Sequence, residues 1–164
     1  MVTPHIETLC TTLAHVLGAR KLSLCTAESC TGGFIANRLM QTPGISSVFP
    51  GSIVCYSNDV KISELGVDQA IIEEFGAVSE PCALAMANGV RAKFNTQLAI
   101  VTTGIAGPDG GSKEKPVGLV YIAVSTETHS ICKKFRLFGN REQIIQRSSN
   151  AAIWMVKQVL TIPL

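Results

Sequence analysis

Residues 22–44, LSLCTAESCTGGFIANRLMQTPG, place a short apolar run before two glycines and a helical pattern. The run at 22–27 is β-compatible, and Pro43 with Gly44 ends the helix that is expected after the glycines. A strand, a glycine-rich turn and a helix in this order are typical of α/β folds. Because open α/β sheets bind ligands where their strands end, the turn is also the first place to look for a site.

The rest of the chain alternates helical and β-compatible segments in the same way. Segment 79–94 is the clearest helix, because Ser79 can act as its N-cap and Pro81 stands in the first turn, where its missing N–H costs little. Segments 119–126 and 130–138 flank a polar turn and are expected to form a hairpin. Further helices are expected at 5–21 and 140–160, further strands at 51–57 and at the start of 97–118, and a mixed polar segment at 58–67.

Length and composition favour one compact domain. The chain has 164 residues, of which 46% are hydrophobic and 16% charged, so it can bury a substantial core and is not expected to be disordered. With the order of elements, this predicts a three-layer α/β/α sandwich over residues 1–164. Its sheet should be mixed and mostly parallel, with one antiparallel strand. The high apolar content also leads us to expect a homo-oligomer.

Charge and hydropathy argue against several classes of partner. The net charge is only +2 and the Lys and Arg residues are scattered, so no nucleic-acid footprint is present. No segment reaches the ~18–20 apolar residues of a membrane span, and the N-terminus lacks the pattern of a signal peptide. We therefore expect a cytoplasmic protein that binds neither nucleic acid nor membrane.

The cysteines do not suggest a metal site. Six are present without a C-x-x-C pair, and the three histidines are not spaced as ligands beside them. In a reducing compartment such thiols are expected to be small core residues. We expect no metal and no cofactor.

The turn at 28–33 has two interpretations. If the helix begins near Ser29 to Thr31, its free backbone N–H groups favour an anion or a developing oxyanion, and Gly32 and Gly33 let a ligand approach closely. Alternatively, Ser29 or Thr31 is a plain N-cap and the glycines only allow tight packing. The motif alone does not decide between them.

Tyr56 and Lys61 follow the strand expected at 51–57. A serine hydroxyl needs a base to remove its proton, and a partly desolvated lysine can be that base, with a tyrosine hydroxyl assisting. The ordinary alternative for a lysine in a polar segment is a solvated surface charge.

The long loop at 102–118 contains glycines but neither nucleotide-binding motif. Its sequence, TTGIAGPDGGSKEKPVG, fits neither the phosphate-loop nor the dinucleotide pattern. Thr102 and Thr103 could offer hydroxyls to a ligand, and the following glycines a nest of N–H groups. A structural loop built from turn residues is the competing interpretation.

Other residues remain open alternatives. Cys30 could be a nucleophile at a helix N-terminus, although no histidine is placed to assist it. Arg141 and Arg147 in the last helix could bind a phosphate or lie on its exposed face. Nothing in the spacing brings together the three carboxylates of Glu28, Asp109 and Glu114 for acid–base work.

Five blocks in order resemble the CinA C-terminal domain family, the nicotinamide-nucleotide amidohydrolases. They are TAESCTGG (26–33), GSIVCYSNDVK (51–61), GAVSEP (76–81), TGIAGPDGGSKEKPVG (103–118) and FGNR (138–141), and the resemblance extends from about residue 5 to about residue 160. It implies a three-layer α/β/α fold and hydrolysis of nicotinamide mononucleotide to nicotinate mononucleotide and ammonia, without a metal. It also leads us to expect the stand-alone form, without the additional N-terminal domain of some members.

The resemblance also implies roles for individual residues. Ser29 matches the nucleophile, and Tyr56 and Lys61 match the pair that handles its proton. Substrate contacts are implied for Thr103, with Gly104 beside it, and for Arg141. From the helix start itself, we expect backbone N–H groups of Thr31, Gly32 and Gly33 to contact the substrate by receiving the oxyanion. The alternative is a non-catalytic regulatory module that binds a nucleotide or a protein; phosphoryl transfer is disfavoured because the phosphate-loop motif is missing.

Overall fold

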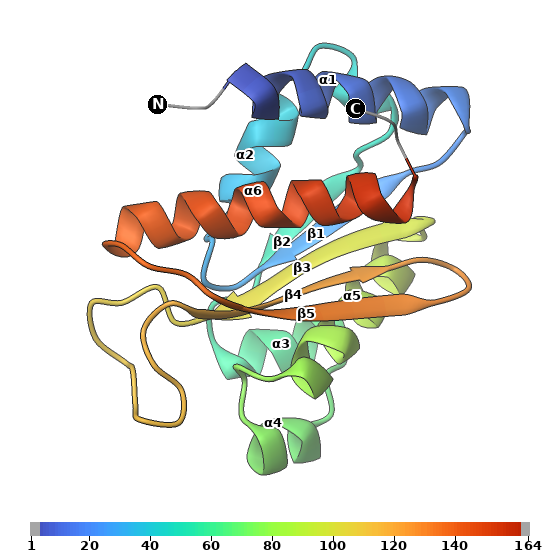
Figure 1. The fold of residues 1–164 in the computed structure, drawn as a ribbon. Helices are drawn as coiled ribbons and strands as arrows, with labels where there is room; N and C mark the ends of the chain where they lie inside the picture. Colours follow the sequence, from blue (N-terminus) through green and yellow to red (C-terminus); the bar gives the residue numbers. More distant parts are fainter. Residues whose placement is uncertain (1–3, 162–164) are drawn as a thin grey trace.

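The computed structural model describes residues 4–161. A five-stranded sheet lies between two layers of helices, with α1, α2 and α6 on one face and α3, α4 and α5 on the other (Figure 1). The expected three-layer α/β/α sandwich is confirmed. In chain order the elements are α1 (Pro4–Ala19), β1 (Leu24–Glu28), α2 (Phe34–Met40), the 3₁₀ turn η1 (Ile45–Ser47), β2 (Gly51–Val54), α3 (Asn58–Leu65), α4 (Gln69–Phe75), α5 (Glu80–Phe94), β3 (Leu98–Gly104), β4 (Leu119–Ser125), β5 (Ser130–Arg136) and α6 (Arg141–Val159).

The strands are ordered β2-β1-β3-β4-β5. β1 pairs in parallel with β2 and β3, whereas β4 is antiparallel to both β3 and β5. Four strands therefore run one way and β4 alone runs the other way, as the hairpin at 119–138 predicts. The carboxyl ends of β1, β2 and β3 meet at one edge of the sheet, where parallel α/β sheets form their ligand sites.

Successive side chains of a strand point to opposite faces of the sheet, and this divides the core into two layers. On β3, Leu98 and Ile100 pack with α1, α2 and α6, whereas Ala99 and Val101 pack with the α3 and α5 side. The central strands β1 and β3 have no exposed face, so apolar residues stand on both faces rather than alternating with solvated ones. This burial fixes the strand register, and with it the residues that emerge at the carboxyl edge.

Three elements differ from expectation. The polar segment at 58–67 contains α3, whose N-cap Ser57 accepts a hydrogen bond from the Val60 N–H, and α4 follows it. These helices have little apolar periodicity because they lie at the margin of the fold, and α4 has no buried residue. β2 is an edge strand and is only partly buried, rather than the buried strand expected at 51–57.

Helix α3 packs closely against α5. The contact is at Gly89 of α5, where a Cβ atom would lie 1.8 Å from the carbonyl oxygen of Leu65 at the end of α3. Only glycine leaves this space, so α5 sets how closely α3 can approach the sheet. Because α3 carries Lys61, this packing also positions a candidate site residue.

Candidate active site

Side chains from three strand ends meet at the carboxyl edge of the sheet. Ser29 follows β1 directly, and its backbone N–H donates to the carbonyl of Thr102 on β3 at 3.0 Å. Lys61 lies in α3, shortly after β2, and Thr103 lies near the end of β3. The parallel pairing of β2, β1 and β3 thus brings together residues that are far apart in sequence.

Ser29 and Lys61 are in direct contact. The Lys61 amine forms a hydrogen bond with Ser29 Oγ at 3.1 Å. It also donates to the carbonyl oxygens of Cys55 at 2.8 Å and of Tyr56 and Ser57 at 3.4 Å each. The amine is therefore held by the backbone that links β2 to α3, with one side turned toward the serine hydroxyl.

Lys61 is buried without an acidic partner. Its side chain is only 1% exposed, and no carboxylate among residues 4–161 lies within ion-pair distance of its amine. Fully buried lysines are rare unless they are paired, because burial disfavours the charged form. An unpaired amine beside a serine hydroxyl is a typical arrangement for activating a nucleophile.

The glycine turn is arranged differently from the expected oxyanion site. The Gly33 N–H donates to the carboxylate of Glu28 at 3.0 Å, and the Gly32 N–H donates to the Ser29 carbonyl at 3.2 Å. The Thr31 hydroxyl donates to the same carboxylate at 2.7 Å. Thr31, Gly32 and Gly33 do not line the cavity at Ser29, because these groups are used inside the protein.

The backbone N–H groups of Cys30 and Thr31 remain available. Neither donates to another residue's backbone within residues 4–161, and the Cys30 N–H faces only its own thiol sulfur. Both follow the serine directly, and Cys30 lines the cavity. N–H groups next to a nucleophile are well placed to receive an oxyanion.

The Tyr56 hydroxyl contacts Arg141 rather than the serine and lysine. Its hydroxyl accepts a hydrogen bond from Arg141 Nη2 at 2.9 Å, and Arg141 Nη1 donates to the Gly107 carbonyl at 2.5 Å. The Tyr56 side chain is 62% exposed, and no hydrogen bond joins its hydroxyl to Ser29 or Lys61 within the part of the chain that the structure describes. Tyr56 and Arg141 therefore form a bridge at the mouth of the site.

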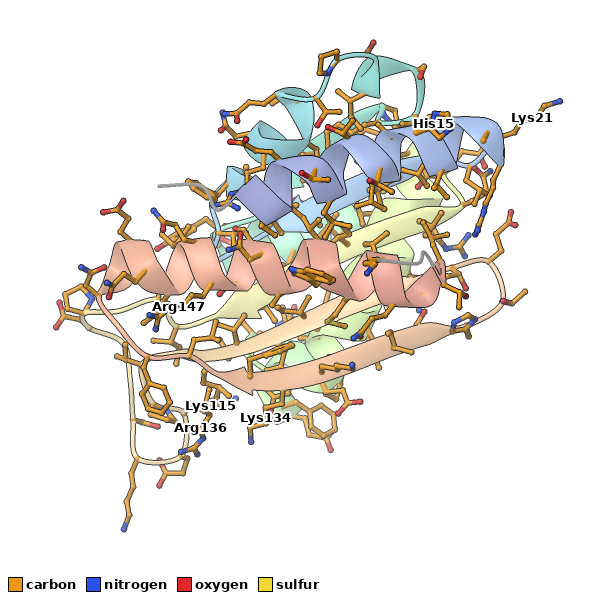
Figure 2. All side chains as sticks on the ribbon, turned by 45° about the horizontal axis from the view of Figure 1, so that its top comes forward. His15, Lys21, Lys115, Lys134, Arg136 and Arg147 are labelled. Carbon is orange, nitrogen blue, oxygen red and sulfur yellow. The ribbon has the colours of Figure 1, made fainter. Side chains whose placement is uncertain are left out.

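Arg141 and Arg147 have different positions in α6. Arg141 lines the cavity, in the first turn of the helix. Arg147 donates to the Phe138 carbonyl and does not line it (Figure 2). The structure thus separates two arginines that the sequence left as close competitors.

A cavity of about 250 Å³ lies above Ser29 and Lys61. Thr103, Gly104 and the start of the long loop form one wall, and the Thr103 hydroxyl donates to the Ala77 carbonyl at 2.7 Å. A Cβ atom on Gly104 would lie 2.7 Å from the Leu119 carbonyl oxygen, so a larger residue would disturb this wall. The opposite end of the loop is anchored by Lys115 (Figure 2), whose ammonium donates to the Phe75 carbonyl at 2.6 Å.

Cys30 is an unsuitable nucleophile. Burial raises the pKa of its thiol to about 12 and outweighs the lowering effect of its own backbone N–H, and the nearby Glu28 carboxylate adds a smaller rise. The thiolate is the reactive form of cysteine, so this thiol is inert near neutral pH. The cysteines are all free thiols.

Glu28, Asp109 and Glu114 do not form a carboxylate cluster. Glu28 is buried, Asp109 lines the cavity and Glu114 accepts from the Ser112 hydroxyl at 3.1 Å. Within residues 4–161 no group of three or more His, Cys, Asp or Glu side chains is arranged to hold a metal ion. None of the helices in the same range has the length and apolar character that crossing a bilayer requires.

Several participants could not be found from sequence. The carbonyls of Cys55 and Ala77 and the N–H groups of Cys30 and Thr31 are backbone atoms, which carry no residue-type signal. The Glu28 carboxylate could have been noticed as a charged residue at the end of an apolar strand. Its partners nevertheless depend on how the following turn folds.

Fold and site together define an α/β domain with a serine–lysine pair at the carboxyl edge of a mixed sheet. A family model described as the CinA C-terminal domain matches residues 6–160. The chain belongs to this family. The resemblance seen in five sequence blocks is thereby confirmed.

Curated relatives carry names from the same family. A "CinA-like protein" from Dictyoglomus thermophilum is 50% identical over 132 residues, which cover 80% of this chain and 32% of that protein. A "putative competence-damage inducible protein" from Clostridium acetobutylicum is 43% identical over 157 residues, which cover 93% of this chain and 38% of that protein. The chain thus spans roughly a third of the length of these relatives.

Solved structures have the same fold. The competence/damage inducible protein CihA from Agrobacterium tumefaciens has a TM-score of 0.93 and 37% identity, covering 98% of each chain. A competence-damaged protein (CinA) superfamily protein from Escherichia coli has a TM-score of 0.90 and 30% identity, covering 94% of this chain and 90% of that chain.

Proposed function

We propose that the protein is an amidohydrolase that converts nicotinamide mononucleotide to nicotinate mononucleotide and ammonia. The observation that carries the proposal is the 3.1 Å contact between Ser29 Oγ and a buried, unpaired Lys61 amine. The resemblance to nicotinamide-nucleotide amidohydrolases supplies the substrate. CinA-family membership is compatible with this activity.

In the proposed first step, neutral Lys61 acts as the general base. A neutral amine has two N–H donors and one lone pair, so it can donate to the Cys55 carbonyl and to one further carbonyl while accepting the Ser29 proton. Ser29 Oγ then attacks the carboxamide carbon. Because lysine and serine are in contact, this transfer needs no relay through Tyr56, and we assign Tyr56 to the mouth of the site.

The N–H group of Cys30, which lines the cavity, is proposed to receive the oxyanion, with that of Thr31 next to it along the turn. One such donor is worth roughly 2.7–4 kcal/mol of transition-state stabilisation in other enzymes. When the C–N bond breaks, protonated Lys61 gives its proton to the leaving nitrogen, which departs as ammonia. Water, deprotonated by Lys61, then attacks the Ser29 ester and releases the carboxylic acid and the free hydroxyl.

Arg141 is proposed to bind the phosphate. It lies in the first turn of α6, where the positive end of the helix dipole adds to its charge. Its two partners, the Gly107 carbonyl and the Tyr56 hydroxyl, leave that charge unneutralised. Thr103 and Gly104 would contact the rest of the substrate along the cavity wall.

The test is ammonia release from nicotinamide mononucleotide. Wild type should release ammonia and nicotinate mononucleotide in equal amounts, and Ser29→Ala should release neither while keeping the melting temperature of wild type. Full activity in the folded Ser29→Ala variant would remove Ser29 from the chemistry.

The second candidate is a regulatory module that binds a nucleotide or a protein without catalysis. The names of the relatives refer to competence and damage induction and not to a reaction, and this supports the regulatory module as a second candidate. Calorimetry with nicotinamide mononucleotide distinguishes the two functions. Binding without product after prolonged incubation of wild type would favour the module.

A further inference from the structure

The carboxylate of Glu28 has an unusual set of partners for a buried charge. Glu28 is fully buried, and no cation among residues 4–161 forms an ion pair with it. Its Oε2 atom accepts from the Thr31 hydroxyl at 2.7 Å and from the N–H groups of Gly33 and Ile35 at 3.0 Å each. Its Oε1 atom accepts from the Ala36 N–H at 2.8 Å and from the Thr26 hydroxyl at 3.4 Å.

These contacts fix the turn that carries Ser29. The N-cap position of α2 is Gly33, which has no side chain to cap the helix, so a residue of β1 supplies the cap instead. The carboxylate at the end of β1 thus bonds the start of α2 and fixes both ends of the turn from Ser29 to Gly33. The Thr31 hydroxyl also lies 2.7 Å from the Thr102 hydroxyl, which ties the turn to β3.

The backbone of Glu28 holds the other half of the pair. Its carbonyl oxygen accepts from the Cys55 N–H at 2.9 Å, and the Cys55 carbonyl accepts from the Lys61 amine at 2.8 Å. One residue is therefore connected to Ser29 through its carboxylate and to Lys61 through its backbone. The distance between the nucleophile and its base depends on both connections.

We infer that Glu28 is a positioning residue for the serine–lysine pair. Its carboxylate takes up the N–H groups at the start of α2 and holds Ser29 against Lys61. It leaves the N–H groups of Cys30 and Thr31 free for the oxyanion. This inference rests on the proposed amidohydrolase function and extends it to a residue that never touches the substrate.

The test is Glu28→Gln, which keeps the shape of the side chain but offers only one acceptor oxygen. Whichever way the amide turns, its NH₂ group faces a backbone N–H, and the turn must shift. Three quantities are measured: kcat for ammonia release, the rate at which a small phosphonofluoridate labels Ser29, and the Kd of nicotinamide mononucleotide. Labelling joins Ser29 Oγ to phosphorus, expels fluoride and transfers the serine proton to Lys61, so it reports the pair without the substrate.

We expect Glu28→Gln to lower kcat and the labelling rate at least tenfold. The Kd, measured in a Ser29→Ala background, should change less than threefold, because the substrate contacts lie elsewhere. The matched control is Asp68→Asn, which removes the carboxylate that caps α4 by accepting from the Ala70 N–H at 2.9 Å. It should leave all three quantities unchanged.

A folded Glu28→Gln variant with the kcat and labelling rate of wild type would overturn the inference. A loss of affinity for nicotinamide mononucleotide as large as the loss of kcat would also overturn it. If Glu28→Gln does not fold, Thr31→Val keeps the carboxylate and its backbone donors but loses the hydroxyl. That variant should be labelled several-fold more slowly than wild type, and labelling at the wild-type rate would overturn the inference. A wild type that is labelled but releases no ammonia would contradict the proposed substrate, while the labelling comparison would still test Glu28.

Discussion

Lys61 is the residue whose environment most departs from what its sequence context suggests. It stands in a polar segment, where a lysine is normally a solvated charge. The structure instead buries it against Ser29, with three carbonyls as its other partners. Burial without a counter-ion is costly, which is why we propose a functional role for this amine beside Ser29.

Replacement of Lys61 by Arg should abolish turnover. A guanidinium keeps its charge near neutral pH and cannot accept the serine proton, so kcat should fall by roughly 10²–10⁴. The control is Lys93→Arg, because Lys93 is an exposed lysine paired with Glu64 at 2.9 Å. Ammonia release is measured for both variants, and their melting temperatures check that they fold. An active Lys61→Arg enzyme would exclude the serine–lysine scheme.

Sequence could predict the two residues that we propose to react, but not the surrounding geometry. Ser29 and Lys61 were both candidates from their motifs, and their contact depends on pairing between β1 and β2. The oxyanion donors were expected at Thr31 to Gly33, whereas Glu28 occupies the Gly33 N–H. Whether a side chain or a ligand takes a backbone N–H group depends on how the turn folds, and the residue pattern does not show this.

At the scale of elements, helices with strong end signals were predictable and short marginal helices were not. α5 begins with Ser79 as its N-cap, and the Ser79 hydroxyl accepts from the Cys82 N–H at 3.3 Å, as expected. α3 and α4 were missed because their stability comes from packing and caps rather than from an apolar stripe. The helix that carries Lys61 was therefore hidden from sequence analysis.

Gly89→Ala should destabilise the protein and slow catalysis together. The added Cβ would lie 1.8 Å from the Leu65 carbonyl oxygen, so α3 must move away from α5 and take Lys61 with it. Overpacking of this kind costs about 1–3 kcal/mol. Denaturant unfolding and kcat for ammonia release measure the two effects.

Gly18→Ala is the matched control for this contact. Its added Cβ would lie 3.9 Å from Val48, which is an ordinary contact, and alanine suits the α1 helix better than glycine. Stability should be unchanged or higher, with normal kcat. If Gly89→Ala behaved like Gly18→Ala, the close packing of α3 on α5 would not be what positions Lys61.

Across the whole molecule, buried thiols should make stability depend on alkaline pH. Burial raises the pKa of Cys10, Cys25 and Cys55 to about 11, and that of Cys30 and Cys132 to about 12. In the unfolded chain these thiols ionise at about 8.5–9. The folded state therefore binds more protons than the unfolded state between these values.

The free energy of unfolding should accordingly be constant with respect to these thiols below about pH 8.5 and fall as pH rises toward 11. Each thiol can contribute up to about 1.4 kcal/mol per pH unit in that range. Urea unfolding under reducing conditions at several pH values measures the slope of the free energy of unfolding against pH. Cys10→Ala should make this slope shallower by the contribution of one thiol proton. A stability that stays flat to pH 10.5 would mean that the thiols are not protected from ionisation.

The whole architecture was more predictable than the site. Continuous apolar runs at β1 and β3 and the polar turn between β4 and β5 are enough to infer a mostly parallel sheet with one antiparallel strand. The cavity is made by loops and backbone groups whose positions depend on tertiary packing. Homo-oligomer formation stays a prediction.

The central claim is that Ser29 forms an acyl-enzyme with the substrate, and hydroxylamine partitioning tests it most directly. An ester on Ser29 reacts with hydroxylamine as well as with water. In the presence of nicotinamide mononucleotide and hydroxylamine, wild type should release ammonia and form the mononucleotide hydroxamate in a share that rises with hydroxylamine, and Ser29→Ala should form neither product. Ammonia release that yields only nicotinate mononucleotide at every hydroxylamine concentration, or that persists in Ser29→Ala, would contradict the account.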